Sequence, residues 1–400
     1  MRNALVFLGT LTIVLIFWPY RLFSHELVTT TVTYDREISQ ILKKKCIMCH
    51  SENNLGMPFT SYEQTRPWSR AIEDEVLVRH MPPWRAVQGY NQFTNDLSLT
   101  NRERQFMVSW AEGNGPKSKN QESVLNFDEE TPLNERLKFD SKRWRLGKPD
   151  LAKTLPGNLI APGGVEEVRR VTIDLGLGSE RSVRALEFQP GDRRVLRGAD
   201  FFLKETGQWL GSWTAWYGVT TLPPDTAYQV PAGSHVIVEL HYKGTAEAVE
   251  DRSTLGLYFA QKPAAHRPSD LVLESKAEAT SSVDAQRFAG SVRMLADAKI
   301  LALRPELTPG IESVEVTARK PDGTVEVLLL IKDALPEWPT PYILSQPVAL
   351  PKYTQLDVSA YYARSSGKRL PASFLLTVRL NDAAEIGSDA DRGSATVGHR

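Results

Sequence analysis

Cysteine and net charge are scarce in this sequence of 400 residues. Its two cysteines are too few for a disulfide-stapled scaffold, so a packed core has to stabilise the fold. The 48 basic and 48 acidic side chains cancel, which leaves no positive field of the kind that nucleic-acid binding needs and argues against nucleic acid as a partner. With 41% hydrophobic and 24% charged residues, the chain is neither disordered nor polytopic, and its length predicts two or three domains.

Long hydrophobic runs are also rare, and the one that stands out opens the chain. Residues 4–18 carry no charge and follow a basic start, which predicts an export signal within residues 1–24. The run fits either a cleaved signal peptide, with Ser24 before the cleavage site, or a retained transmembrane anchor with Trp18 and Tyr20 at the interface. In both cases we expect the rest of the protein on the periplasmic side of the membrane.

Helical periodicity marks the first domain. Apolar residues recur at helical spacing over about 34–45, and a capping box formed by Thr100 and Glu103 predicts a second helix. We expect the chain between these helices to be rich in turns. The pattern predicts a compact all-helical domain over 33–115, followed by a polar, charged linker over 116–144.

Two-residue alternation replaces the helical period after residue 144, which predicts half-buried strands. A Pro-Asp-Gly turn at 321–323 between two alternating runs predicts a hairpin. The length of this part suits two β-sandwiches, over 145–265 and 270–380, and the polar tail 381–400 is expected to be disordered. The predicted fold is multidomain: an N-terminal all-α domain followed by two all-β sandwich domains of jelly-roll-like type.

Both cysteines belong to one pentapeptide, Cys46-Ile47-Met48-Cys49-His50. This is the C-x-x-C-H signature of covalent haem attachment, in which two thiols add to the haem vinyl groups and the adjacent histidine becomes the proximal iron ligand. The competing interpretation is a thioredoxin-like redox pair, which would need a βαβ context and no histidine at that place. The motif predicts one covalently bound haem c.

A six-coordinate haem iron needs a second ligand, and four side chains of the helical domain are candidates: Met57, His80, Met81 and Met107. We favour Met81 as the distal ligand because Pro82 and Pro83 stiffen its loop. His80 is the main alternative. Trp84, just beyond, is expected either to contact the haem or to be a core aromatic.

The stretch from 24 to 116 resembles the single-haem cytochrome c domains of acidobacterial-type exported proteins. The resemblance lies in HELVTTTVTYDREISQIL, CIMCH, YEQTRPW, HMPPW and SWAEGNGP and covers the whole predicted helical domain. It implies haem on Cys46 and Cys49, with His50 and Met81 as the ligands of the haem iron.

Residues 143–380 resemble the β-sandwich pair of copper type II, ascorbate-dependent monooxygenases of the peptidylglycine alpha-hydroxylating kind, through RWRLGKPDL, VRALEFQPGDRRV, VPAGSHVIVELHY and DRSTLGLYFA. That family binds one copper through a His-His pair and the histidine of an H-Y motif, and a second through two close histidines and a methionine. Here Arg197 and Gly198 stand at the His-His position, only His241 of the H-Y motif is present, and the second segment has Arg304. We therefore expect no copper and no catalytic residues in the sandwiches.

These observations predict an exported monohaem c-type cytochrome that transfers electrons through a His/Met haem iron. The sandwiches would serve for docking or for assembly into a membrane-associated redox complex. The expected partner is a redox protein, and a membrane-bound respiratory or photosynthetic complex is one candidate. The alternative is a haem-fed copper monooxygenase, most of whose copper ligands are missing.

Overall fold

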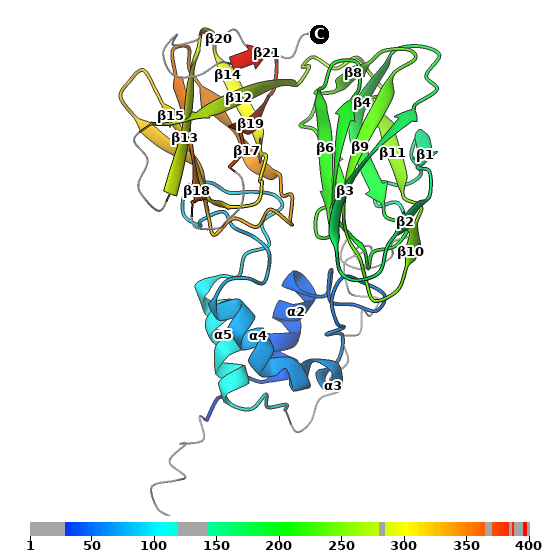
Figure 1. Ribbon diagram of the computed structural model, residues 1–400, viewed down its shortest axis with the longest axis vertical. Coiled ribbons are helices and arrows are strands. Elements are labelled where there is room, and N and C mark those ends of the chain that lie inside the picture. Colours follow the sequence, from blue (N-terminus) through cyan, green and yellow to red (C-terminus); the bar gives the residue numbers. More distant parts are fainter. Residues whose placement is uncertain are drawn as a thin grey trace, which may run out of the picture.

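The computed structural model describes residues 29–118, 143–279, 285–364, 370–383, 386–387 and 395–397. Most of these residues with regular structure are in strands, and the helices among them all lie in the N-terminal part, here called the helical unit (29–118). Figure 1 shows this unit at one end of the molecule, beneath two β-rich units that lie side by side. Among the described residues, no helix is both long and apolar enough to cross a membrane. The expected leader, 1–24, lies outside the described residues, as does most of the expected linker.

The helices of the helical unit are η2 (Tyr34–Ile38), α2 (Ser39–Lys45), α3 (Tyr62–Thr65), η3 (Arg66–Trp68), α4 (Ser69–Leu77) and α5 (Asn101–Glu112). The predicted first helix is present as η2 followed directly by α2. The predicted capping box is confirmed, because the Thr100 hydroxyl accepts from the Glu103 N–H while the Glu103 carboxylate accepts from the Thr100 N–H. Between these helices we expected a stretch rich in turns, and the structure also has α3, η3 and α4 there, which the sequence did not predict. Only Ile72 and Val76 give α4 a buried apolar side, too weak a periodic signal to predict it.

The first β unit spans 151–259. Its strands are β1 (Leu151–Thr154), β2 (Asn158–Ile160), β3 (Glu166–Asp174), β4 (Arg181–Gln189), β5 (Leu196–Leu203), β6 (Trp209–Thr214), β7 (Val219–Thr221), β8 (Tyr228–Val230), β9 (His235–Lys243), β10 (Val249–Asp251) and β11 (Thr254–Phe259). A five-stranded sheet orders β1-β11-β4-β7, with β8 also on β4, and a four-stranded sheet orders β3-β9-β5-β6. Side chains alternate between buried and half-buried along β9, so Val236, Val238 and Leu240 face the core. His235 and His241 share the other face.

The second β unit spans 269–397. Its strands are β12 (Ser269–Ala277), β13 (Ala285–Met294), β14 (Ala298–Pro305), β15 (Ile311–Arg319), β16 (Val325–Lys332), β17 (Tyr342–Leu350), β18 (Gln355–Ala363), β19 (Ser373–Leu380), β20 (Ile386–Gly387) and β21 (Ala395–Val397). They form one antiparallel sheet whose main path is β16-β15-β18-β13-β12-β19-β14-β17. Strands β12 and β13 pair over only two residues each, so the sheet divides there into two halves that share one core. This gives a sandwich-like unit from a single sheet.

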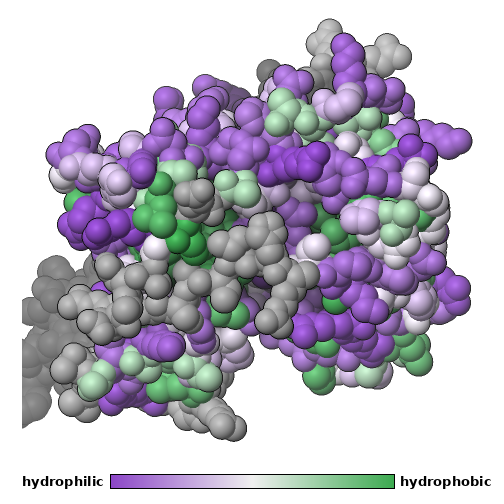
Figure 2. Space-filling view, turned by 90° about the horizontal axis from the view of Figure 1, so that it is seen from above, coloured by the Kyte–Doolittle hydropathy of each residue, from purple (hydrophilic) through white to green (hydrophobic). Residues whose placement is uncertain are grey.

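Two details of this unit bear on the sequence predictions. The expected hairpin is confirmed: β15 and β16 pair across the 321–323 turn, in which Gly323 has a φ of 86°. In the tail 381–400, for which we expect no fixed structure, β20 pairs with β13 and β21 pairs with β12. Figure 2 shows the end of the molecule that is formed by the β units. On this surface hydrophilic side chains dominate and hydrophobic ones form small separate groups.

A segment of the helical unit, residues 84–97, completes the second β unit. Strands β16 and β17 are the two ends of the sheet path, and Ala86 bridges to Ile331 on the first while Phe93 bridges to Leu344 on the second. The Asn95 amide donates to the Pro341 carbonyl at 2.6 Å. The segment thus covers sheet edges that would otherwise present unpaired backbone groups.

The two β units meet through buried ionic contacts. Arg379 on β19 binds Asp270 on β12 at 3.0 Å, lies 4.1 Å from the centre of the Trp209 ring and donates to the Tyr228 hydroxyl. Asp270 also accepts from the Trp209 backbone N–H at 2.7 Å. Because a buried charge without a partner is costly, this network fixes the first unit against the second.

Candidate functional site

An apolar cavity of about 370 Å³ lies inside the helical unit and extends to both β units. Its walls come from α2, the loop after it, α4, the 80–83 loop and α5. Four of the predicted site residues line it: Cys46, Cys49, His50 and Met81. The fold therefore brings the C-x-x-C-H motif and the methionine loop to one space.

Local backbone geometry sets the direction of the motif. Helix α2 ends at Lys45, but the turns continue: the Cys46 N–H donates to the Leu42 carbonyl and the His50 N–H donates to the Cys46 carbonyl, each at 2.9 Å. The Cys49 N–H also donates to the Cys46 carbonyl, at 3.0 Å. Residues three and four apart on such turns face the same side, so both thiols and the imidazole point to the cavity.

The His50 ring is held in one orientation and one tautomer. Its Nδ1 lies 3.0 Å from the Met57 carbonyl oxygen, which can only accept, so Nδ1 carries the proton and Nε2 keeps a lone pair. The Phe59 ring stacks on the imidazole at 4.5 Å between centres, with 7° between the planes. Burial lowers the pKa of His50, which favours the neutral ring. A neutral imidazole that donates one ring N–H to a carbonyl and keeps a lone pair on the other nitrogen is a typical metal ligand.

The two cysteines are unpaired and protonated. Burial raises the pKa of Cys46 to about 12 and that of Cys49 to about 11. A thioredoxin-like pair needs a stabilised thiolate, and these surroundings do the opposite. The motif also lies among helices and not at a βαβ crossover.

All four candidates for a second ligand reach the cavity, in different ways. The His80 Nδ1 is bound to the Glu75 carboxylate at 2.5 Å. Met107 is fully buried in the core face of α5, and Met57 is 41% exposed. Met81 follows His80 on the loop that ends in Pro82 and Pro83, both of which also line the cavity. The donors present, two thiols, imidazole and thioether in an apolar space, fit a haem c.

Trp84 has a different position. It is buried against Phe93 and Tyr342, with ring centres 5.8 and 5.2 Å away, and it is not among the residues that line the cavity with the cysteines. These contacts are those of a core aromatic, which is one of the two roles expected for Trp84 from the sequence.

Two β-unit side chains complete the cavity, and neither was predicted from the sequence as a site residue. Arg197 on β5 and Trp338, before β17, both line it, and the Arg197 guanidinium lies 4.6 Å from the Trp338 ring centre. A Cβ on Gly198 would lie 2.5 Å from Pro339, so β5 and the segment before β17 are in close contact here. Burial lowers the pKa of Arg197, while Glu166, 3.7 Å away, acts in the opposite direction.

Arg193, between β4 and β5, ties the C-x-x-C-H motif to the first β unit. Its Nη2 donates to the carbonyls of Met48 and Ala215, each at 3.0 Å. Burial lowers the pKa of Arg193. Among the described residues, no carboxylate lies within 4.0 Å of its guanidinium nitrogens. Arg193 is therefore a buried positive charge beside Cys49 that only carbonyl groups and the Trp213 ring compensate. No sequence spacing could reveal a contact between residues 145 positions apart.

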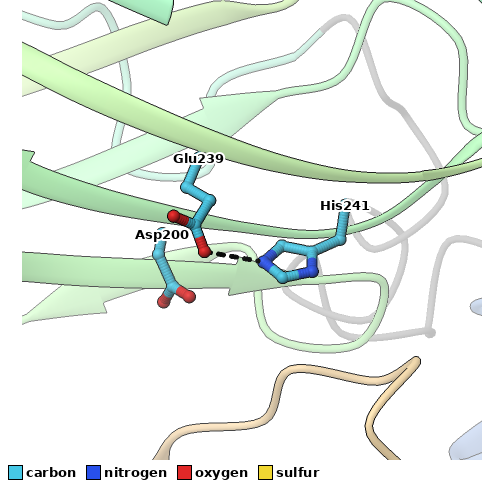
Figure 3. A group of neighbouring side chains, drawn as sticks. All are labelled: Asp200, Glu239 and His241. Carbon is cyan, nitrogen blue, oxygen red and sulfur yellow. Dashed lines mark ion pairs between the residues drawn. The ribbon is translucent and has the colours of Figure 1, made fainter. Parts of the chain in front are cut away.

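A second group of ionisable side chains lies between β5 and β9 (Figure 3). Ligand atoms of Asp200, Glu239 and His241 lie within 4.8 Å of one another, an arrangement that a divalent cation could use. Arginines already neutralise it, because Arg170 binds Glu239 at 2.6 Å and Arg304 lies 3.7 Å from Asp200. His241, at 3.4 Å, and Arg170 lower the pKa of Glu239 to about 2.

The other histidines of the β units are each engaged separately. His235 pairs with Glu205 at 3.0 Å and His266 with Asp382 at 2.7 Å. Within the described residues they join no cluster of three metal-ligating side chains. The residues at the positions where the copper-family resemblance would place ligands, Arg197 and Arg304, instead make contacts between the two β units.

No family model and no curated protein sequence matches this chain. Among solved structures, the major capsid protein of bacteriophage PM2 is 13% identical and covers 60% of this chain and 100% of its own, with a TM-score of 0.26. An isomalto-dextranase of Arthrobacter globiformis is 13% identical, over 58% of this chain and 35% of its own, at 0.17. Oxalate decarboxylase of Bacillus subtilis is 9% identical, over 68% and 87%, at 0.15. At these TM-scores none of them informs the fold or the function.

The close packing of Gly56 on His50 gives a first prediction. A Cβ on Gly56 would lie 2.5 Å from two atoms of the imidazole, so Gly56→Ala should displace the ring and lengthen its bond to Met57. We expect a loss of about 1–3 kcal/mol in the free energy of unfolding, measured by denaturant titration. Gly178→Ala, which enters open space, should change it by less than about 0.5 kcal/mol. Equal stability of the two variants would contradict this packing argument.

Proposed function

We propose that this chain is an exported c-type cytochrome that carries one covalently bound haem and transfers electrons. The observation that supports it most is the cavity lined by Cys46, Cys49, His50 and Met81, in which His50 keeps a free Nε2. When bound there, haem supplies a one-electron iron couple. Everything else required is positioning, which the chain provides.

Each residue has a distinct role in this proposal. The Cys46 and Cys49 thiols each add across one vinyl double bond, with sulfur going to one carbon and hydrogen to the other, so attachment needs no oxidant. His50 would bind the haem iron through Nε2, in the tautomer that the Met57 carbonyl selects. Met81 would supply a thioether as the second iron ligand, which would raise the reduction potential.

The β units have two roles in this proposal. Arg197 and Trp338 contribute to the cavity wall, and the remaining surface serves for docking or assembly into a membrane-associated redox complex, respiratory or photosynthetic, on the periplasmic side. We propose no copper chemistry, because no observation favours it: Arg197 and Arg304 hold the positions where the resemblance would require ligands.

Covalent attachment is the direct test. Expressed with its leader and a c-type haem attachment system, the protein should keep its haem after acid denaturation and extraction with organic solvent, because thioether bonds survive both. The double variant Cys46→Ser/Cys49→Ser should release it, whereas either single variant should retain one bond. A wild-type protein that loses its haem on extraction, or never acquires any, overturns the proposed function.

The identity of the distal ligand can be tested independently. Met81→Ala should open the ferrous iron to carbon monoxide, and Met81→His should keep six-coordination at a lower reduction potential. The control is Met57→Ala, which changes another cavity methionine and should leave the spectrum unaltered. If Met57→Ala opens the iron and Met81→Ala does not, the assignment of Met81 is wrong.

Arg193 should raise the reduction potential, because a buried positive charge beside the attachment motif disfavours the ferric state. We expect Arg193→Gln to shift the couple toward ferric iron about tenfold, about 59 mV in a redox titration, and Arg193→Lys to shift it less. The matched control is Arg194→Gln, since Arg194 is more exposed and already paired with Asp192 at 2.6 Å. An equal shift in Arg193→Gln and Arg194→Gln would rule out a specific effect of the buried charge.

A further inference from the structure

A second cavity lies on the other side of the Met81 loop. It measures about 260 Å³ and shares four wall residues with the cysteine cavity: Val76, Met81, Pro82 and Leu99. Its polar lining is cationic. Arg79 follows α4, Arg104 lies in the first turns of α5, Arg85 precedes the bridge to β16, and Lys332 ends β16.

These cations lack anionic partners. Among the described residues no carboxylate lies within 4.0 Å of their side-chain nitrogens, although Asp333, which lines the cavity, and Glu337 act on Arg85 from a greater distance. The Nε of Arg85 is buried without a hydrogen-bond partner. Burial lowers the pKa of Arg104, and the like charge of Arg79 lowers it further. Four cations near one another with only one acidic side chain in the cavity lining raise the free energy of the fold, and an anion between them would lower it.

The position of Arg104 adds to this imbalance. Helix α5 begins at Asn101, so Arg104 lies near the positive end of the helix dipole, where acidic residues are favoured and basic ones are not. Its Nη1 and Nη2 reach only neutral groups, Asn101 Oδ1 at 3.0 Å and the Leu99 carbonyl at 3.4 Å. Both the helix end and the guanidinium would gain from a negative charge in the cavity.

We propose that this cavity binds a small oxyanion from solution, a phosphate or a carboxylate. Guanidinium groups match such anions through paired N–H donors, and three of them converge here with one ammonium group. Arg79 and Lys332 are exposed, so the site is open to solvent and a free anion can enter. The apolar cavity with the cysteines lies beyond the shared wall.

The shared wall gives the site a consequence for electron transfer, and this part alone rests on the proposed function. A bound anion places negative charge beside the Met81 loop and thereby favours ferric iron in the neighbouring cavity. By linkage, the ferric protein should bind the anion more tightly than the ferrous protein, by the same factor that shifts the couple. The site would let the concentration of a small anion set the reduction potential.

Calorimetric titration of the full-length protein with inorganic phosphate at low ionic strength tests the binding directly. We expect one saturable site, which Arg104→Gln and Arg79→Gln each weaken about tenfold or more. The matched control is Arg102→Gln, on the same helix and exposed but outside the cavity lining, which should leave the affinity within about twofold. Because Arg79 is exposed, its variant should fold even if replacing Arg104 disturbs α5.

Three results would overturn the proposal. One is the absence of saturable binding with both phosphate and malonate as probes. Another is an equal loss of affinity in Arg102→Gln. The third is binding to the haem-free protein only, which would mean that the carboxylates of the haem itself fill the site. Calorimetry measures anion binding, whereas solvent extraction measures covalent haem, so failure of this proposal and failure of the proposed function are distinguishable.

Discussion

The arrangement of the three units depends on Arg197, a cation that has lost most of its water. Its guanidinium lies over the Trp338 ring and 3.7 Å from Glu166, while its side chain lines the cavity of the helical unit. Desolvation of such a charge costs several kcal/mol unless these neighbours are all in place. The Trp216 ring, 5.9 Å from Trp338, closes the junction from the first β unit. Each unit thus supplies part of the surroundings that the cation needs.

The arginine contacts between the β units are reciprocal. Arg197 extends from the first unit to Trp338 of the second, and Arg304 extends from the second to Asp200 of the first. The Arg304 guanidinium also lies 4.9 Å from the Phe202 ring. These are the positions at which the resemblance to copper monooxygenases would require ligands. Long side chains that reach across the interface make it a contact surface between the two β units.

Local signals were sufficient for part of the fold. The capping box at Thr100 and the turn at 321–323 each involve residues within a few positions of one another, and the structure has both. The alternation along β9 likewise needs only the two-residue period of a strand. Helix α4 escaped notice because half of its buried side chains, Ser69 and Glu73, are polar. The spacing of apolar residues therefore cannot predict such a helix.

The sequence predicted only those residues of the candidate site that belong to short local motifs. Cys46, Cys49 and His50 form one pentapeptide whose spacing is specific, and the loop of Met81 has a recognisable proline pair. Arg193 and Trp338 meet this region through tertiary packing, across separations that no local pattern encodes. The cationic cavity is of the same kind, since Lys332 joins Arg79 and Arg104 only after the second β unit has folded.

The segment 84–97 is synthesised long before the strands whose edges it covers. Asn95 is made 246 residues before Pro341, the residue whose carbonyl it binds, and the partner strand β17 is complete only near the end of translation. During synthesis, the helical unit therefore precedes the sheet edges that this segment covers. Until the last strands arrive, the segment has no strand to pair with, and the lining that Trp338 supplies to the cavity is still missing. The pocket around the cysteines is thus unfinished until the C-terminal strands close over it, which leaves the thiols accessible during that interval.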